Sequence, residues 1–257
     1  MEDTIVKIVG NGWVGKAMKT LFPDALVHDP MQGLTSEERA DICFVCVPTP
    51  LLGGNLDCGI VEEVVSKSNE DLIIIRSTIN PGTSDYLTRQ YGKRIVFQPE
   101  YLGETVNHPL TDQKARPFLV LGGAPEDRRQ AIELYQKVYN ANVTIRQVTN
   151  LEAEIIKLTE NRAIAFKMMQ CQELYDACEA AGVDYYTIRD AVYSDDPRFN
   201  LFRTFIFPDN RGFNSSKCLL KDVPAWAAWA ESVGIDPVLT KVLIQKSNEY
   251  AERNNSK

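Results

Sequence analysis

The sequence predicts an α/β domain built on a parallel sheet at residues 1–149, followed by an all-α domain at residues 150–257. In the first half, short runs rich in β-formers alternate with helical stretches, a rhythm typical of parallel strands joined by helical crossovers. Several of these runs, such as 72–75, are apolar without alternation, as expected for strands covered by helices on both faces. From about Asn150 onward the hydrophobic pattern is helical throughout.

Seven strands are expected in the first domain, at residues 4–9, 25–28, 42–47, 72–76, 95–98, 118–122 and 143–146. The second domain is expected to contain a helix of about thirty residues at 151–182 and shorter helices at 184–193, 223–233 and 237–253. Between them, residues 195–216 are rich in Asp, Pro, Asn and Gly and predict a long loop. Loops of this length tend to carry function.

Composition excludes several classes of protein. Apolar residues make up 44% and charged residues 25%, the balance of a globular protein. The net charge is -7 with acidic residues spread along the chain, which disfavours binding to nucleic acid. No apolar run approaches the roughly 20 residues that a bilayer requires, and the start is acidic rather than secretory, so we expect a cytoplasmic protein. Its six cysteines are expected to be reduced thiols, with Cys43 and Cys46 packed in a strand rather than binding a metal.

A glycine-rich motif directly follows the first expected strand. Gly10-Asn11-Gly12-Trp13-Val14-Gly15 fits the pattern G-x-G-x-x-G and opens a helix. The first glycine allows a tight turn, the second lets backbone approach a pyrophosphate, and the third allows close packing of helix on strand. The motif in this setting predicts a Rossmann-type dinucleotide site.

Asp29 stands 19 residues after Gly10, at the end of the second expected strand. A carboxylate here accepts hydrogen bonds from an adenosine ribose and repels a 2′-phosphate. Because neither His28 nor Pro30 adds a cation beside it, NAD is the expected cofactor rather than NADP.

Five further segments make the prediction more specific. They are Val47-Pro48-Thr49-Pro50, residues 77–83, Pro99-Glu100-Tyr101-Leu102-Gly103-Glu104, residues 154–161, and Cys218-Leu219-Leu220-Lys221-Asp222. In this order they resemble the UDP-glucose/GDP-mannose dehydrogenase family across nearly the whole chain. The resemblance implies NAD-dependent oxidation of a nucleotide sugar, such as UDP-glucose, at C6. The alcohol becomes an aldehyde and then the uronic acid, with a cysteine carrying the intermediate.

The resemblance also implies roles for single residues. Cys218 matches the nucleophile, Lys157 and Asn161 stabilise and orient the reacting oxygen, and Asp222 with Thr78 holds or activates the attacking water. Glu100 and Glu104 match glutamates with general-base and cofactor-positioning roles. The resemblance further implies cofactor contacts at Val47, Pro48, Thr49, Thr78 and Glu104, and substrate contacts at Glu100, Tyr101, Leu102, Lys157, Asn161, Arg198 and Lys221. For Arg198, a salt bridge to Asp195 or Asp196 is nearly as plausible.

The sequence departs from the family in two places. Residues 212–218 replace the usual glycine pair with Asn214 and Ser215, which is expected to alter the sugar pocket or reposition the thiol. The chain also stops where relatives continue into a second Rossmann-like domain, so we expect a short form.

Two alternatives therefore remain open: a two-electron dehydrogenase of the β-hydroxyacid type acting on a small substrate, and a non-catalytic NAD-binding relative. A homodimer formed through the helical domain is expected by resemblance.

Overall fold

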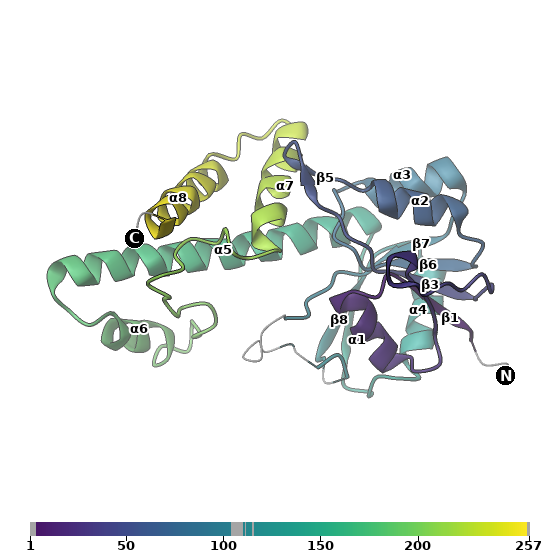
Figure 1. Cartoon of the computed structure of the whole chain (residues 1–257). Helices are drawn as coiled ribbons and strands as arrows, with labels where there is room; N and C mark the ends of the chain where they lie inside the picture. Colours follow the sequence, from purple (N-terminus) through teal and green to yellow (C-terminus); the bar gives the residue numbers. More distant parts are fainter. Residues whose placement is uncertain (1–3, 104–109, 111, 115, 256–257) are drawn as a thin grey trace. The chain divides into compact units, whose positions relative to one another are not determined.

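The computed structural model describes residues 4–103, 110, 112–114 and 116–255. The chain divides into two compact units (Figure 1). Residues 1–52 and 56–157 form the first, and residues 53–55 and 158–257 form the second. The division at residues 157 and 158 falls inside a helix that both units share, α5 (Asn150–Ala181).

A five-stranded parallel sheet forms the centre of the first unit. Its strands lie in the order β2 (Leu26–His28), β1 (Val6–Val9), β3 (Ile42–Val45), β6 (Leu72–Ile75) and β7 (Ile95–Phe97). Two further strands, β8 (Phe118–Leu121) and β9 (Thr144–Gln147), pair in parallel with each other. The predicted α/β fold with a parallel sheet is confirmed.

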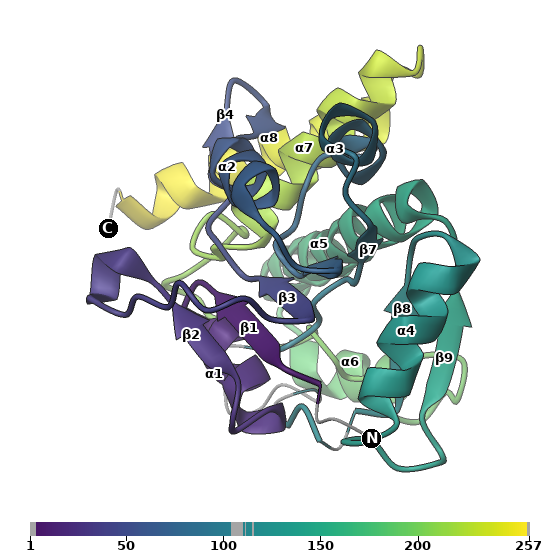
Figure 2. The same cartoon turned by 90° about the vertical axis from the view of Figure 1, so that its right-hand side faces the viewer.

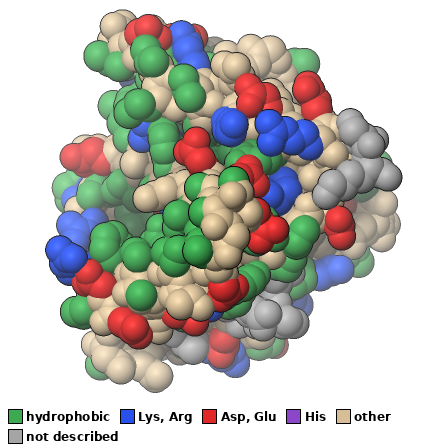
Figure 3. All heavy atoms as spheres, turned by 90° about the vertical axis from the view of Figure 1, so that its left-hand side faces the viewer, with side chains coloured by type: hydrophobic (Ala, Val, Ile, Leu, Met, Phe, Trp, Pro, Cys, Tyr) green, Lys and Arg blue, Asp and Glu red, His purple; other side chains and the backbone are tan. Residues whose placement is uncertain are grey.

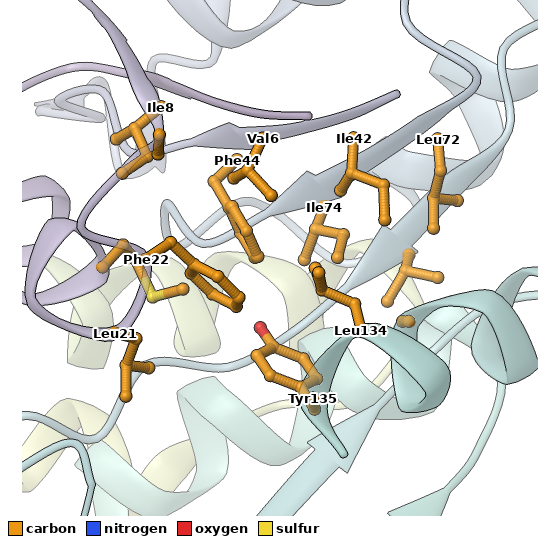
Figure 4. Close-up of a cluster of buried hydrophobic side chains, with 14 of the residues drawn as sticks. Val6, Ile8, Leu21, Phe22, Ile42, Phe44, Leu72, Ile74, Leu134 and Tyr135 are labelled. Atoms are coloured by element: carbon orange, nitrogen blue, oxygen red, sulfur yellow. The ribbon is translucent and has the colours of Figure 1, made fainter. Parts of the chain in front are cut away.

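Helices cover both faces of this sheet. Figures 1 and 2 show α2 (Gly59–Lys67) and α3 (Thr83–Tyr91) on one side, and α1 (Trp13–Leu21) and α4 (Pro125–Tyr135) on the other. Alternate residues of each strand point to opposite faces. Phe44 and Ile74 pack with α1 and α4, as Figure 4 shows, whereas Val45 and Ile75 pack with α2 and α3. Double burial explains why these strands are apolar without alternation.

The second unit consists of helices, the long loop between α6 and α7, and the tip of a small hairpin. Besides most of α5 it contains α6 (Tyr185–Tyr193), α7 (Leu219–Ser232) and α8 (Val238–Asn255). One core joins α5, α7 and α8 around Ala165, Leu219 and Tyr250, and another packs Cys171 against Tyr185 of α6. Within the part of the chain that the structure describes, no helix has the length and apolarity needed to cross a membrane.

Two details differ from the expected elements. The hairpin of β4 (Leu51–Leu52) and β5 (Asn55–Leu56) was not predicted, since strands of two residues carry no readable alternation. Helix α7 begins at Leu219 rather than at residue 223. Proline usually marks a helix start, but Pro224 lies inside α7, and the Asp222 N–H already bonds the Cys218 carbonyl at 2.9 Å.

Candidate active site

The glycine-rich loop joins β1 to α1 at the carboxyl edge of the sheet. Gly10 has φ +92°, and a Cβ there would lie 2.4 Å from the carbonyl oxygen of Cys46. A Cβ on Gly15 would lie 1.9 Å from the carbonyl oxygen of Gly10. By contrast, a Cβ on Gly12 would meet nothing within 4 Å. Gly10 and Gly15 are thus required for close backbone packing within the fold, whereas the open space at Gly12 suits the close approach of a dinucleotide.

Asp29 follows β2 and faces this loop. Its Oδ2 accepts hydrogen bonds from the backbone N–H of Asn11 at 2.8 Å and from Nε2 of Gln32 at 2.9 Å. Gln32 also exchanges hydrogen bonds with Asn11, at 3.0 and 3.2 Å. Asp29 therefore stands where a ribose-binding carboxylate is expected, and these residues fit NAD. No sequence motif pointed to Gln32, which lies in the short 3₁₀ helix Pro30–Gln32.

Two loops at the carboxyl edge are tied to each other. The Thr49 hydroxyl donates to the Thr78 carbonyl at 2.6 Å, and the Ser77 hydroxyl donates to the Val47 carbonyl at 2.7 Å. These bonds connect the segment after β3 with the segment after β6. The expected cofactor positions Val47, Pro48, Thr49 and Thr78 thus belong to one connected edge, whereas Glu104 lies outside the described residues.

Glu100 lies in a buried cluster of charges. It forms ion pairs with Arg76 and with Arg116, the latter at 2.6 Å, and accepts hydrogen bonds from Nε2 of Gln113. The backbone N–H groups of Tyr101 and Leu102 donate to its Oε1 at 2.7 Å each. Burial alone would raise the pKa of this carboxyl, but the two guanidinium groups lower it to about 2. Such a carboxylate is a weak base, so the arrangement favours electrostatic positioning over proton transfer.

Lys157 and Tyr101 meet within the first unit. The Lys157 Nζ lies 5.3 Å from the centroid of the Tyr101 ring, within the range of a cation–π contact, and both residues are buried. The backbone of Tyr101 is itself fixed on Glu100. Sequence alone gave no account of how a buried ammonium is stabilised here.

Asn161 and Asp222 are joined within the second unit. Asn161 Nδ2 donates to Asp222 Oδ2 at 2.5 Å, and Lys221 Nζ donates to Oδ1 at 2.7 Å. Asp222 is only 1% exposed. A buried carboxylate with a donor on each oxygen has a fixed orientation. The structure thus brings together three of the predicted site residues, Asn161, Lys221 and Asp222.

Cys218 is the N-cap residue of α7 and is exposed. Its thiol therefore lies near the helix N-terminus, where backbone N–H groups and the helix dipole favour negative charge. The charge of Arg203 interacts with that of Cys218, opposing the burial that lowers the pKa of Arg203. Arg203 is also the single non-glycine residue with positive φ, at 64°, in the described ranges. Sequence analysis did not identify this cation.

The loop before Cys218 is anchored by α5 and α8. The Gly212 N–H donates to Oε1 of Gln172 at 2.6 Å, and the Phe213 N–H donates to the Ser247 hydroxyl at 2.9 Å. That hydroxyl donates in turn to Oδ1 of Asn214 at 2.6 Å. Asn214, which replaces a family glycine, thus forms a defined contact with α8. Neither Gln172 nor Ser247 carried a sequence signal.

Arg198 is placed on the surface. It pairs with Asp196 through Nε and Nη2, at distances of 3.0 and 2.5 Å, and its side chain is 80% exposed. This salt bridge is the alternative to substrate binding by Arg198 that the sequence left open. A contact with substrate stays a prediction.

The fold and the glycine-rich loop define a Rossmann-type dinucleotide-binding protein with an attached helical unit. Models of the UDP-glucose/GDP-mannose dehydrogenase family match most of the chain, the NAD-binding domain at residues 31–142 and the central domain at residues 151–250. The chain belongs to this family, and its first unit contains the family's NAD-binding domain.

Among curated relatives, the GDP-mannose 6-dehydrogenase of Pseudomonas aeruginosa is 29% identical, covering 97% of this chain and 62% of the relative. The UDP-glucose 6-dehydrogenase AglM of Haloferax volcanii is 25% identical, covering 83% and 53%. A UDP-glucose dehydrogenase structure from Pyrobaculum islandicum matches with a TM-score of 0.78 and 21% identity, covering 96% and 68%. The chain thus spans less than two thirds of the length of these two curated relatives.

Proposed function

We propose that this protein oxidises a UDP-glucose-like nucleotide sugar at C6, from the alcohol through the aldehyde to the uronic acid, with Cys218 carrying the acyl group. The observation that carries the proposal is the arrangement around α7. The exposed Cys218 is the N-cap residue of the helix, and four residues further on Asp222 is buried and fixed by Asn161 and Lys221. A direct hydride transfer from a small hydroxyacid gives no role to this thiol.

In the first oxidation, the C6 hydroxyl releases a proton to solvent water and the carbon gives up a hydride, which leaves the aldehyde. NAD, which residues 10–15 and Asp29 would hold, would accept that hydride, and a second NAD bound at the same site would accept the hydride of the second oxidation. The ammonium of Lys157 stabilises the oxygen as negative charge develops, and the amide of Asn161 orients it. Their i, i+4 spacing on α5 places both side chains on one helix face.

In the second oxidation, the Cys218 thiolate adds to the aldehyde carbon and forms a carbon–sulfur bond. Loss of hydride from the resulting thiohemiacetal leaves a thioester. Arg203 and the α7 N-terminus favour the thiolate form of Cys218. Water then attacks the thioester, the carbon–sulfur bond breaks, and the carboxylate product leaves with the thiol restored.

We assign the attacking water to Asp222, and a contribution of Thr78 stays a prediction from the family resemblance. The buried Glu100 carboxylate fixes the backbone of Tyr101 and Leu102, and Tyr101 in turn contacts Lys157. Glu100 therefore acts by positioning rather than by accepting a proton. The names of the relatives extend the candidate sugars to GDP-mannose and to UDP-N-acetyl-mannosamine.

The test measures NADH formed per sugar consumed, with UDP-glucose, GDP-mannose and UDP-N-acetyl-mannosamine each supplied at high concentration. Two NADH per sugar and a uronic acid product are expected. Cys218→Ala is expected to abolish acid formation, whereas Cys58→Ala, a partly buried thiol of the first unit, serves as the control. If a small β-hydroxyacid supplied in place of the sugars gives one NADH per molecule, and Cys218→Ala retains this activity, the two-electron alternative is established. Normal NAD binding with no turnover of any sugar or hydroxyacid would leave the non-catalytic alternative.

We further propose a homodimer formed through the helical unit. This unit exposes large apolar side chains around α6, including Phe199, Phe205 and Phe207, and on α8 at Val238, Leu239 and Val242. Figure 3 shows hydrophobic side chains gathered between charged ones on one face of the molecule. Light scattering of the purified chain is expected to give twice the 28.9 kDa monomer mass, and a monomer at micromolar concentration would refute the dimer.

A further inference from the structure

Glu154, on the second turn of α5, forms a contact that the proposed chemistry does not use. Its Oε2 accepts the Gly82 N–H at 2.5 Å, and its Oε1 accepts the Ser84 N–H at 2.9 Å. The side chain is fully buried, with a relative exposure of 0%. Gly82 is the N-cap residue of α3 and Ser84 lies in its first turn. One carboxylate thus satisfies two N–H groups at the start of α3, which lie 72 and 70 residues away in sequence.

The contact joins two segments that carry predicted site residues. Along α5, Lys157 follows Glu154 by three residues, so the two side chains lie on nearly the same face of the helix. On the other side, Gly82 lies four residues after Thr78, in the loop between β6 and α3. The first turns of α5 are therefore fixed to the loop of Thr78 by a pair of charge-assisted hydrogen bonds.

We infer that Glu154 is a positioning residue that holds Lys157 against the Tyr101 ring and thereby sets the place of its ammonium. As an account of turnover, this inference rests on the proposed function. The two hydrogen bonds fix the rotation of α5 about its axis, and the cation–π distance of 5.3 Å depends on that rotation. A shift of about 1 Å in a catalytic group is enough to lower turnover by about a hundredfold.

Both hydrogen bonds require the ionised carboxylate, because a protonated carboxyl offers only one good acceptor oxygen. Burial raises the pKa of Glu154 to about 7, in opposition to the hydrogen bonds from Ser84 and Gly82. Besides Lys157 on the same helix, Asp85 on α3 faces Glu154 and raises this pKa further, and Cys58 before α2 also interacts with the Glu154 charge. The contact is therefore expected to strengthen as the pH rises above 7 and to weaken as the pH falls below it.

The first experiment does not depend on turnover. In protein labelled with ¹⁵N at glycine and serine, the amide signals of Gly82 and Ser84 are expected to shift with a midpoint near pH 7. Glu154→Gln is expected to remove this titration, since an amide does not ionise. Glu179→Gln, an exposed glutamate on the same helix, is expected to leave it intact. Absence of titration between pH 5 and 9, or its persistence in Glu154→Gln, would overturn the contact as described.

A ring-labelled tyrosine experiment reports on Lys157 directly. The signal of Tyr101, assigned with Tyr101→Phe, is expected to move in Glu154→Gln in the same direction as in Lys157→Met. It is expected to stay in place in Glu179→Gln. An unmoved Tyr101 signal in Glu154→Gln would refute the positioning of Lys157, whatever substrate the protein uses.

A third experiment measures steady-state kinetics with whichever sugar the wild-type protein oxidises. Glu154→Gln is expected to lower kcat about ten- to a hundredfold, with the KM for NAD within about threefold of wild type, and to abolish the acidic limb of the kcat profile near pH 7. A purely structural role would lower the yield of folded protein without changing that limb. If wild type turns over no sugar, the proposed function fails while the two spectroscopic results still decide the contact.

Discussion

The buried charges around Glu100 make a quantitative prediction about stability. The pKa of Glu100 falls from 4.5 to about 2, a difference equivalent to about 3 kcal/mol in favour of the charged form. Glu100→Gln removes that charge and leaves the Arg76 and Arg116 guanidinium groups buried without a counterion. We therefore expect the free energy of unfolding at pH 7 to fall by at least about 3 kcal/mol.

Arg116→Met is the informative comparison, because it leaves a balanced Arg76–Glu100 pair that Gln113 and two backbone N–H groups still contact. Arg116→Met should lower the free energy of unfolding by less than Glu100→Gln does. Adding Arg116→Met to Glu100→Gln should recover about 1 kcal/mol or more, since one unpaired buried cation is removed. Urea unfolding followed by far-UV circular dichroism gives the free energy of unfolding of each variant. The comparison holds provided that the slope of this free energy against urea concentration is the same in all variants.

The pH dependence provides an independent check. The folded-state pKa of Glu100 is depressed, so its contribution is full above pH 4.5 and is lost as the pH falls toward 2. The stability difference between wild type and Glu100→Gln should therefore narrow only below pH 4.5. The reasoning is refuted if Glu100→Gln lies within 1 kcal/mol of wild type at pH 7, or if Arg116→Met is the more damaging change.

Three further predictions concern the cofactor loop and the loop before Cys218. Gly15→Ala should lower the melting temperature of the protein without ligand, because its Cβ would lie 1.9 Å from a backbone oxygen. Gly12→Ala should leave that melting temperature unchanged but weaken NAD binding, measured by calorimetry. Equal melting temperatures for the two variants would contradict this assignment. Asp29→Ala should raise the Kd for NAD about tenfold while changing the Kd for NADP much less, because the carboxylate is expected to bind the ribose and repel a 2′-phosphate; unchanged NAD affinity would exclude Asp29 from the site. Ser247→Ala removes the hydrogen bonds to Phe213 and Asn214 and should cost about 1–2 kcal/mol, with faster hydrogen exchange at Phe213; unchanged exchange would show that the loop is held otherwise.

The sequence by itself predicted the regular elements of the sheet. Strands such as β3 and β6 are contiguous apolar runs, and the glycine pattern stands directly between a strand and a helix. These signals are local, because a run of consecutive apolar residues is enough to indicate a buried strand. Family motifs supplied the names of the site residues in the same way, as short segments.

The partners of those residues were decided by the tertiary structure. Glu100 matched one of two family glutamates with general-base and cofactor-positioning roles, and the sequence did not show that its carboxylate pairs with Arg76, which lies 24 residues before it, and with Arg116, which lies 16 residues after it. Asp222 is fixed by Asn161, which is 61 residues away. A carboxylate looks the same in sequence whether it is solvated, buried or paired, and its pKa depends on that difference.

The start of α7 shows what the sequence predicted and what only the tertiary structure decided. Its apolar pattern predicted a helix, but the chain folded Pro224 into the helix and placed Cys218 at its N-cap. Gln172 on α5 and Ser247 on α8 then fix the preceding loop through contacts 34 to 40 residues apart. Periodicity and composition determined which segments form helices and strands. Which charges and hydrogen-bond donors meet was decided only by packing, because those pairings depend on the simultaneous burial of residues far apart in the chain.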